Sequence, residues 1–191
     1  MALTLNEGSN YTPPPAGLHP ALCIGVVDLG QQVSVYGTKP KLLLMFELPT
    51  CLMDDGRPYT ISRRFTATLH RQGNLRPFLA AWRGKDLQAE ETKNFDVGVL
   101  LGKPCRLFVQ HEEREGKLYA NIENVLKPEA NQSTQAVNLL VRFDLDAPDA
   151  ALKAQLPEWV RKVIDQAVIV PKSEPATAAT EPAPFDDDLT F

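Results

Sequence analysis

Residues that usually build enzyme active sites and metal sites are scarce in this sequence. Its 191 residues include three histidines, His19, His70 and His111, which lie far apart along the chain. No cysteine or histidine pair has the spacing of a zinc site. No phosphate-binding glycine loop, nucleophile elbow or metalloprotease motif occurs. We therefore predict a protein that is not an enzyme and that needs neither a metal nor another cofactor.

Long hydrophobic runs and paired cysteines are also absent. No apolar run approaches the ~20 residues that span a bilayer, and residues 1–7 lack the basic and apolar regions of a signal peptide. The three cysteines, Cys23, Cys51 and Cys105, stand apart among apolar residues. This is typical of buried free thiols in a reducing compartment. These features predict a cytoplasmic protein that does not contact membranes.

Acidic residues are missing from the middle of the chain. The net charge of −4 is unfavourable for binding a nucleic acid, but residues 172–191 alone carry one lysine and five acidic residues. From Arg57 to Lys85 the sequence has seven basic residues and no acidic one. Because the local potential governs attraction to a polyanion, this basic stretch favours nucleic-acid binding over a merely solvated surface.

The order of the expected elements predicts a mainly β fold with some α-helix. Residue patterns indicate strands at 21–29, 41–48, 59–69, 103–111 and 117–126. Between the third and fourth strands, a helix begins after Asn74 as N-cap and ends at Gly84. Five strands with a helix after the third is the order of the OB-fold, a small Greek-key barrel. Gly25, inside the first strand, indicates a bulge or a sharp bend.

Changes in composition divide the chain into five segments. They are an N-terminal arm (1–17), the OB-fold domain (18–128), an extension with short helices (129–170), a disordered proline-rich linker (171–184) and an acidic tail (185–191).

The extension is expected to contribute further structure. Residues 137–143 are a candidate extra strand, and helices at 148–155 and 157–168 each have proline at the first position. Their apolar stripe consists of Trp159, Val160, Val163, Ile164 and Ala167. We expect this stripe to pack on the barrel, with a homodimer contact as the alternative.

The acidic tail has a distinctive composition. Its sequence is Phe185-Asp186-Asp187-Asp188-Leu189-Thr190-Phe191, three carboxylates between apolar residues. Such a peptide suits docking in which a ring fills an apolar pocket and the carboxylates meet basic residues around it. The tail resembles the C-terminal peptide of bacterial single-stranded DNA-binding proteins, Phe-Asp-Asp-Asp-Ile-Pro-Phe, with Thr190 in place of proline. The resemblance implies that it binds replication and repair enzymes and competes with DNA for the basic face.

A second resemblance lies in the predicted closing hairpin. The run from Leu101 to Cys105, with the run from Gly116 to Ile122, is similar to the hairpin of phage-encoded single-stranded DNA-binding proteins. The two resemblances together imply a phage replication protein in the host cytoplasm. Its tail would recruit a polymerase, helicase or nuclease.

Binding of single-stranded nucleic acid requires cations for the phosphates and aromatic faces for the bases. Strand alternation turns Phe65 toward the core, and it turns Arg106 and Phe108 outward if their neighbours Cys105, Leu107 and Val109 face the core. The residues predicted to contact DNA are Tyr36, Lys39, Arg57, Tyr59, Arg63, Arg64, Arg71, Arg106, Phe108 and Tyr119.

We therefore predict a single-stranded DNA-binding protein of DNA replication that coats and protects exposed strands. A strand-annealing or recombination-mediator protein is one alternative, because it would use the same groove. An interaction adaptor whose barrel binds no DNA is another. RNA binding also stays open, because base stacking does not distinguish the sugars.

Overall fold

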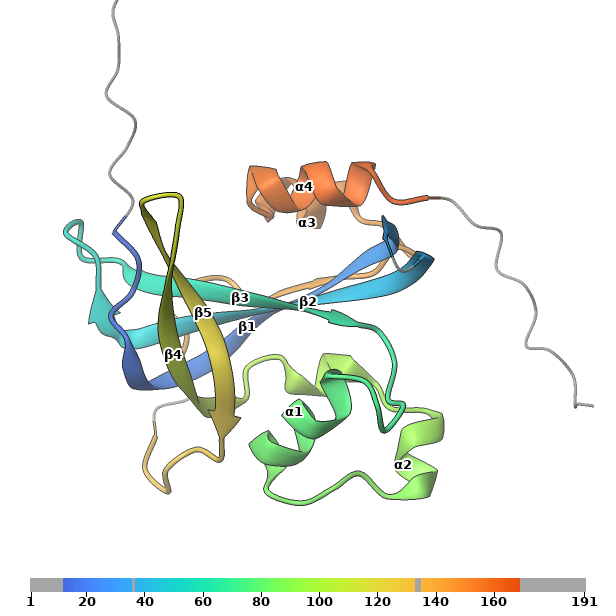
Figure 1. Cartoon of the computed structure of the whole chain (residues 1–191), viewed down its shortest axis with the longest axis horizontal. Coiled ribbons are helices and arrows are strands. Elements are labelled where there is room, and N and C mark those ends of the chain that lie inside the picture. Colours follow the sequence, from blue (N-terminus) through green and yellow to red (C-terminus); the bar gives the residue numbers. More distant parts are fainter. Residues whose placement is uncertain (1–11, 36, 133–134, 169–191) are drawn as a thin grey trace, which may run out of the picture.

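The computed structural model describes residues 12–35, 37–132 and 135–168. The described residues form six strands, four α-helices and one short 3-10 helix. Tyr36, the linker 171–184, the tail 185–191 and most of the predicted N-terminal arm lie outside the described residues. The sheet occupies the middle of the molecule, with helices on both of its sides (Figure 1).

The five expected strands form one antiparallel sheet, and a sixth short strand joins it. They are β1 (Gly17–Ser34), β2 (Gly37–Leu52), β3 (Pro58–Thr66), β4 (Pro104–Arg114), β5 (Lys117–Leu126) and β6 (Val141–Phe143). The strand order is β3-β2-β1-β4-β5, and β6 pairs with β1 in parallel. The edge strands β3 and β5 do not pair with each other, so the sheet is not closed.

A bulge in β1 lets this one strand pair with two different partners. Its first part pairs with β4 up to Leu22, and the register with β2 shifts between Cys23 and Gly25. From Gly25 onward β1 pairs with β6 instead. A Cβ on Gly25 would lie 3.0 Å from the Cβ of Met45, which explains why glycine stands there. The bulge predicted at Gly25 is confirmed.

One face of the sheet packs on α1 (Leu75–Arg83). The apolar side chains between them belong to the larger of two hydrophobic clusters. Its apolar stripe of Leu75, Phe78, Leu79 and Trp82 is buried there. The Nε1 group of Trp82 donates a hydrogen bond to the carbonyl oxygen of Pro104 at 2.8 Å. Gly84 ends the helix with a φ of 68°, as predicted.

Asn74 differs from its predicted role at the start of α1. It occupies the N-cap position, but its side chain makes no capping hydrogen bond, and its backbone is already in the helical region. An N-cap side chain reaches the first free N–H groups from an extended backbone. Asn74 therefore precedes α1 without its side chain capping the free N–H groups of the helix.

The opposite face of the sheet is covered by α3 (Ala150–Gln155) and α4 (Glu158–Asp165) (Figure 1). Val160 and Ile164 of α4 are buried in a second cluster against Val27, Leu29 and Leu43 of the sheet. This explains why β2 is apolar on both faces. The expected packing of the extension on the sheet is confirmed.

The prolines of the extension lie before the helices, two positions earlier than predicted for Pro148 and one for Pro157. Pro148 precedes Asp149, which is the N-cap of α3, and Pro157 is itself the N-cap of α4. The Oδ1 atom of Asp149 accepts a hydrogen bond from the backbone N–H of Ala151 at 2.7 Å. An acidic cap satisfies this free donor more strongly than a neutral side chain would.

Glu47 of β2 is the only charged side chain in the described ranges that is fully buried, with 0% exposure. One carboxylate oxygen accepts a hydrogen bond from the backbone N–H of Val137 at 3.0 Å. The other accepts from the backbone N–H and the side-chain amide of Asn138, at 2.8 and 2.7 Å. Glu47 thus fixes the segment that leads into β6.

Two of the predicted thiols are buried. Cys23 and Cys105 lie inside the larger cluster, Cys51 is half-buried, and all three are free. Burial raises the pKa of Cys23 to about 12 and that of Cys105 well above its usual value. Thiols held protonated in this way are poor nucleophiles.

The segment between α1 and β4 contains two short elements. These are α2 (Ala89–Lys93) and a 3-10 helix (Val97–Leu100). Arg83 Nη2 lies 2.7 Å from Glu91 Oε1, and the backbone N–H of Gln88 donates to Glu91 Oε2 at 2.8 Å. These two contacts join α1 to the start of α2.

The same contacts predict how α2 responds to acid. The Arg83 guanidinium and the Gln88 N–H lower the pKa of Glu91 from 4.5 to about 2. The pKa of Glu91 is therefore lower in the folded state than in the unfolded state. The contacts of Glu91 stabilise the fold above pH 4.5, and this stabilisation is lost as the pH falls toward about 2. We expect the amide proton shift of Gln88 in NMR spectra to titrate near the lower value.

The substitution Glu91→Gln is the matched control, because glutamine keeps the shape and cannot ionise. The titration of the Gln88 amide should then disappear. A titration centred at the ordinary glutamate pKa, or one that persists in the variant, would contradict the proposed origin of the shift.

Candidate nucleic-acid interface

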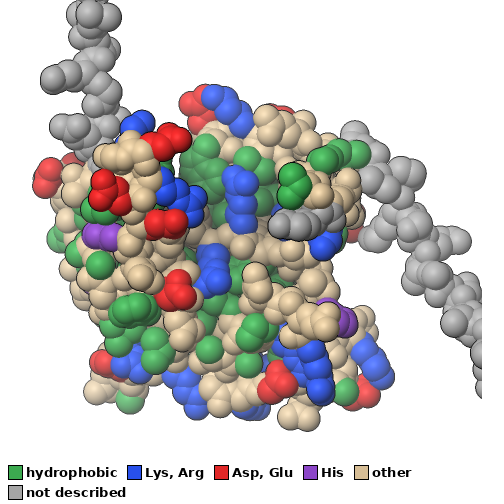
Figure 2. All heavy atoms as spheres, viewed as in Figure 1, with side chains coloured by type: hydrophobic (Ala, Val, Ile, Leu, Met, Phe, Trp, Pro, Cys, Tyr) green, Lys and Arg blue, Asp and Glu red, His purple; other side chains and the backbone are tan. Residues whose placement is uncertain are grey.

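A hollow lies where the sheet fails to close, between β3, β5 and the N-terminal end of α4. Its volume is about 440 Å³, and its lining includes Ile61, Ser62, Tyr119 and Trp159. We call it the cleft. Figure 2 shows basic side chains down the middle of this face, in the region that β3 and β5 occupy in Figure 1, with hydrophobic side chains beside them. The cleft therefore combines the two kinds of group that single-stranded nucleic acid requires.

Two half-exposed aromatic residues line the cleft from different elements. Tyr119 of β5 is 47% exposed and Trp159 of α4 is 43% exposed. Strand alternation turns Tyr119 away from the core, while Val160 and Ile164 anchor α4 and hold Trp159 at the margin of its stripe. Partly exposed aromatic side chains of this kind provide surfaces on which nucleobases stack.

Arg64 supplies a cation beside these rings. It is exposed on β3, and the carbon of its guanidinium lies 5.4 Å from the centroid of the Trp159 ring. This distance is within the range of a cation–π contact. Among the described residues Arg64 forms no ion pair, so its charge is available to a phosphate.

Arg63 points the other way, because neighbouring residues of a strand alternate between faces. Its Nη1 donates to the carbonyl oxygens of Ile122 and Glu123 on β5, at 2.8 and 3.1 Å. Its guanidinium also lies 5.3 Å from the ring of Phe65 and 5.4 Å from that of Phe78. Arg63 therefore bridges the unpaired edges of the sheet, and this structural role accompanies the DNA contact predicted for it.

The basic stretch is partly neutralised in the folded protein. Three of its seven cations pair with acids that lie just outside it in sequence: Arg57 with Asp55, Arg76 with Asp86, and Arg83 with Glu91, at 2.6, 2.9 and 2.7 Å. Arg63, Arg64, Arg71 and Lys85 form no ion pair within the part of the chain that the structure describes. The absence of acids along the sequence thus overstates the local charge.

Several predicted contact residues lie away from the cleft. Arg106 is paired with Glu129 at 3.2 Å, and Phe108, 42% exposed, lies beside it on β4, which β1 and β2 separate from β3 in the sheet. Tyr59 is half-buried against the larger cluster, Lys39 is exposed on β2, and Arg71 is exposed in the turn before α1.

From the predicted set, the structure brings Arg64 and Tyr119 to the cleft, whereas Arg63 turns to the other face of β3. It adds Trp159, which sequence reasoning assigned only to packing. The one available signal was its size, because tryptophan is seldom fully buried even in an apolar stripe.

No protein-family model matches this sequence, and no curated protein matches it. In the described ranges, no group of three or more histidine, cysteine or acidic side chains is placed to hold a metal ion. None of the helices described is both long and apolar enough to cross a membrane.

Proposed function

We propose that this protein binds single-stranded DNA through the cleft, coating and protecting exposed strands during replication. The observation that carries the proposal is the pair of half-exposed rings, Tyr119 and Trp159, in one hollow beside the unpaired cation Arg64. Stacking on such rings contributes roughly 1–3 kcal/mol per base without regard to sequence, and the cation attracts the phosphates.

We also propose that the sheet is an OB-fold barrel left open between β3 and β5. The strand order and the position of α1 between β3 and β4 support this fold. The bridge that Arg63 makes to β5 lies where the closing ladder of such a barrel would run. The sequence resemblances to phage and bacterial single-stranded DNA-binding proteins add support. On this proposal, the acidic tail recruits replication and repair enzymes.

The direct test is a titration of fluorescently labelled oligo-dT, duplex DNA and RNA, measured by anisotropy at about 50 mM and about 200 mM salt. We expect oligo-dT to bind more tightly than duplex DNA. The affinity should fall with salt, with log K decreasing by roughly 0.7 per phosphate contact for each log unit of salt.

Two aromatic substitutions locate the binding surface. Trp159→Ala should weaken oligo-dT binding by roughly tenfold, which corresponds to the loss of one stacked base. Phe108→Ala is the matched control, because Phe108 has almost the same exposure on β4 and lies outside the cleft. An equal loss from both substitutions would mean that binding is not confined to the cleft. No binding of oligo-dT by the unmodified protein would refute the function and favour the adaptor alternative.

A further inference from the structure

A second hollow, lined mainly by apolar side chains, lies at the far end of the molecule from α4. Its volume is about 630 Å³, and Trp82, Phe95, Val99 and Leu100 are part of its lining. It is formed where α1 ends, around the 3-10 helix and the beginning of β4, on the lower side in Figure 1. We call it the apolar pocket. Val99 is 52% exposed there although it is aliphatic.

Trp82, which lines the apolar pocket, has no free hydrogen-bonding group. The Nε1 group of Trp82 already donates to the carbonyl oxygen of Pro104, so the indole presents only apolar surface to a ligand. An occupant is therefore expected to contribute a ring or an aliphatic side chain rather than a hydrogen-bonding group.

The rim of the apolar pocket is basic. Arg83, Lys103 and Lys127 all line it, together with one acid, Glu91. Arg83 is paired with that acid, whereas Lys103 and Lys127 are exposed and form no ion pair with any described residue. The end of the Lys127 side chain lies over Gly84, so its amine lies beside the pocket. Two uncompensated cations at an apolar hollow favour an acidic ligand that carries a ring.

The chain itself contains a segment with this chemistry. Residues 185–191 place three aspartates between Phe185 and Phe191. We propose that the apolar pocket binds the chain's own acidic tail, with a phenylalanine ring on the apolar floor and the aspartates facing Lys103 and Lys127.

The connecting chain is long enough for this docking. The described part ends at Val168, which bridges to Gln31 of β1. Residues 169–184 span up to about 50 Å at ~3.1 Å per residue in an extended, proline-rich chain. A folded unit of this size has a radius of gyration of about 15 Å, so the connecting chain is longer than the folded unit is wide. Tethering also gives the tail an effective concentration near the millimolar range, and a weak peptide affinity is then sufficient.

The apolar pocket, where we propose that the tail docks, is far from the cleft. Tyr119 of the cleft and Lys127 of the apolar pocket lie near opposite ends of β5, about 25 Å apart at ~3.3 Å per residue. The tail in the apolar pocket leaves the cleft open. This differs from the competition with DNA that the resemblance implies, and it does not depend on whether the protein binds DNA.

Fluorine NMR of the full chain labelled with 5-fluorotryptophan tests the proposal directly. The sequence has two tryptophans: Trp82 lines the apolar pocket and Trp159 lines the cleft. Trp159→Phe assigns the two resonances. Replacing Phe185 and Phe191 by alanine should shift the Trp82 resonance and leave that of Trp159 unchanged. The position of the Trp82 resonance should not depend on protein concentration, because the contact is within one chain.

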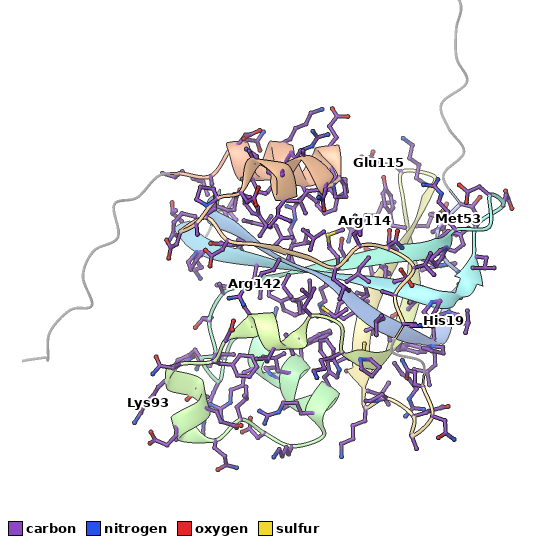
Figure 3. All side chains as sticks on the ribbon, turned by 180° about the vertical axis from the view of Figure 1, so that it is seen from behind. His19, Met53, Lys93, Arg114, Glu115 and Arg142 are labelled. Carbon is purple, nitrogen blue, oxygen red and sulfur yellow. The ribbon has the colours of Figure 1, made fainter. Side chains whose placement is uncertain are left out.

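Charge reversal on the rim provides the coupling test. In a Lys103→Glu/Lys127→Glu background, the tail substitutions should cause no further shift of the Trp82 resonance. In a Lys93→Glu background they should keep their full effect, because Lys93 of α2 points away from the body of the molecule (Figure 3) and is not part of the pocket.

Three results would overturn the proposal. One is a Trp82 resonance that does not respond to the tail substitutions. Another is a shift of the Trp159 resonance instead, because the tail would then occupy the cleft. The third is a dependence on protein concentration, which would assign the pocket to the tail of a second copy.

Discussion

Replacing Glu47 by alanine is expected to destabilise the protein by about 3–4 kcal/mol, measured as the free energy of unfolding in urea. The substitution removes the acceptor of three hydrogen bonds and leaves space at a fully buried position of β2. The segment that carries Val137 and Asn138 would lose its anchor, and β6 follows that segment directly.

Two further variants separate the causes of this loss. Glu47→Gln keeps the volume but turns an NH₂ group toward an N–H donor, so it should cost about 1–3 kcal/mol. Asn138→Ala removes only the side-chain amide, one donor of the three, and should cost less than either. A loss below about 1 kcal/mol for Glu47→Ala would show that water replaces the carboxylate without penalty.

Replacing Arg63 by methionine is expected to cost about 2–3 kcal/mol and to loosen β3 from β5. Two hydrogen bonds to carbonyl oxygens of β5 and the contacts with the rings of Phe65 and Phe78 are lost together. Hydrogen exchange of the β3 and β5 amides should accelerate more than that of β1 and β2, because β3 and β5 are the edges that Arg63 joins.

Arg64→Met is the matched control, since it changes the next residue of the same strand in the same way. Arg64 is exposed and touches only Trp159 among the contacts described for it, so stability should change by less than about 0.5 kcal/mol. Oligo-dT binding should nevertheless weaken. Equal destabilisation by the two substitutions would mean that Arg63 has no bridging role.

Elements with a local, periodic pattern were predictable from the sequence. The four apolar residues of α1 recur at helical spacing, and the alternation of β4 placed Cys105 inward and Phe108 outward, as the structure has them. The short helix α2 was missed because it has five residues and buries none of them. Its stability depends on Arg83 from another helix, which no local pattern records.

The candidate site was predictable only in part, because three distant segments build it. Arg64 and Tyr119 were recognised from residue type and alternation. Trp159 joins them only because the extension folds back over the sheet. The charge of the basic stretch was overestimated for the same kind of reason, since acids such as Asp55 and Asp86 pair with it in three dimensions.

The change of partner along β1 determines how much chain must fold as one piece. The same strand gives Ala21 and Cys23 to one hydrophobic cluster, and Val27 and Leu29 to the other. Loss of packing in one cluster therefore disturbs the strand that the other cluster shares. We expect the protein to unfold in a single cooperative transition. A gene fragment that stops at the predicted boundary after residue 128 would leave Val27, Leu29 and Leu43 facing water. We expect such a fragment to be prone to aggregation, because these side chains pack on α4 in the full chain.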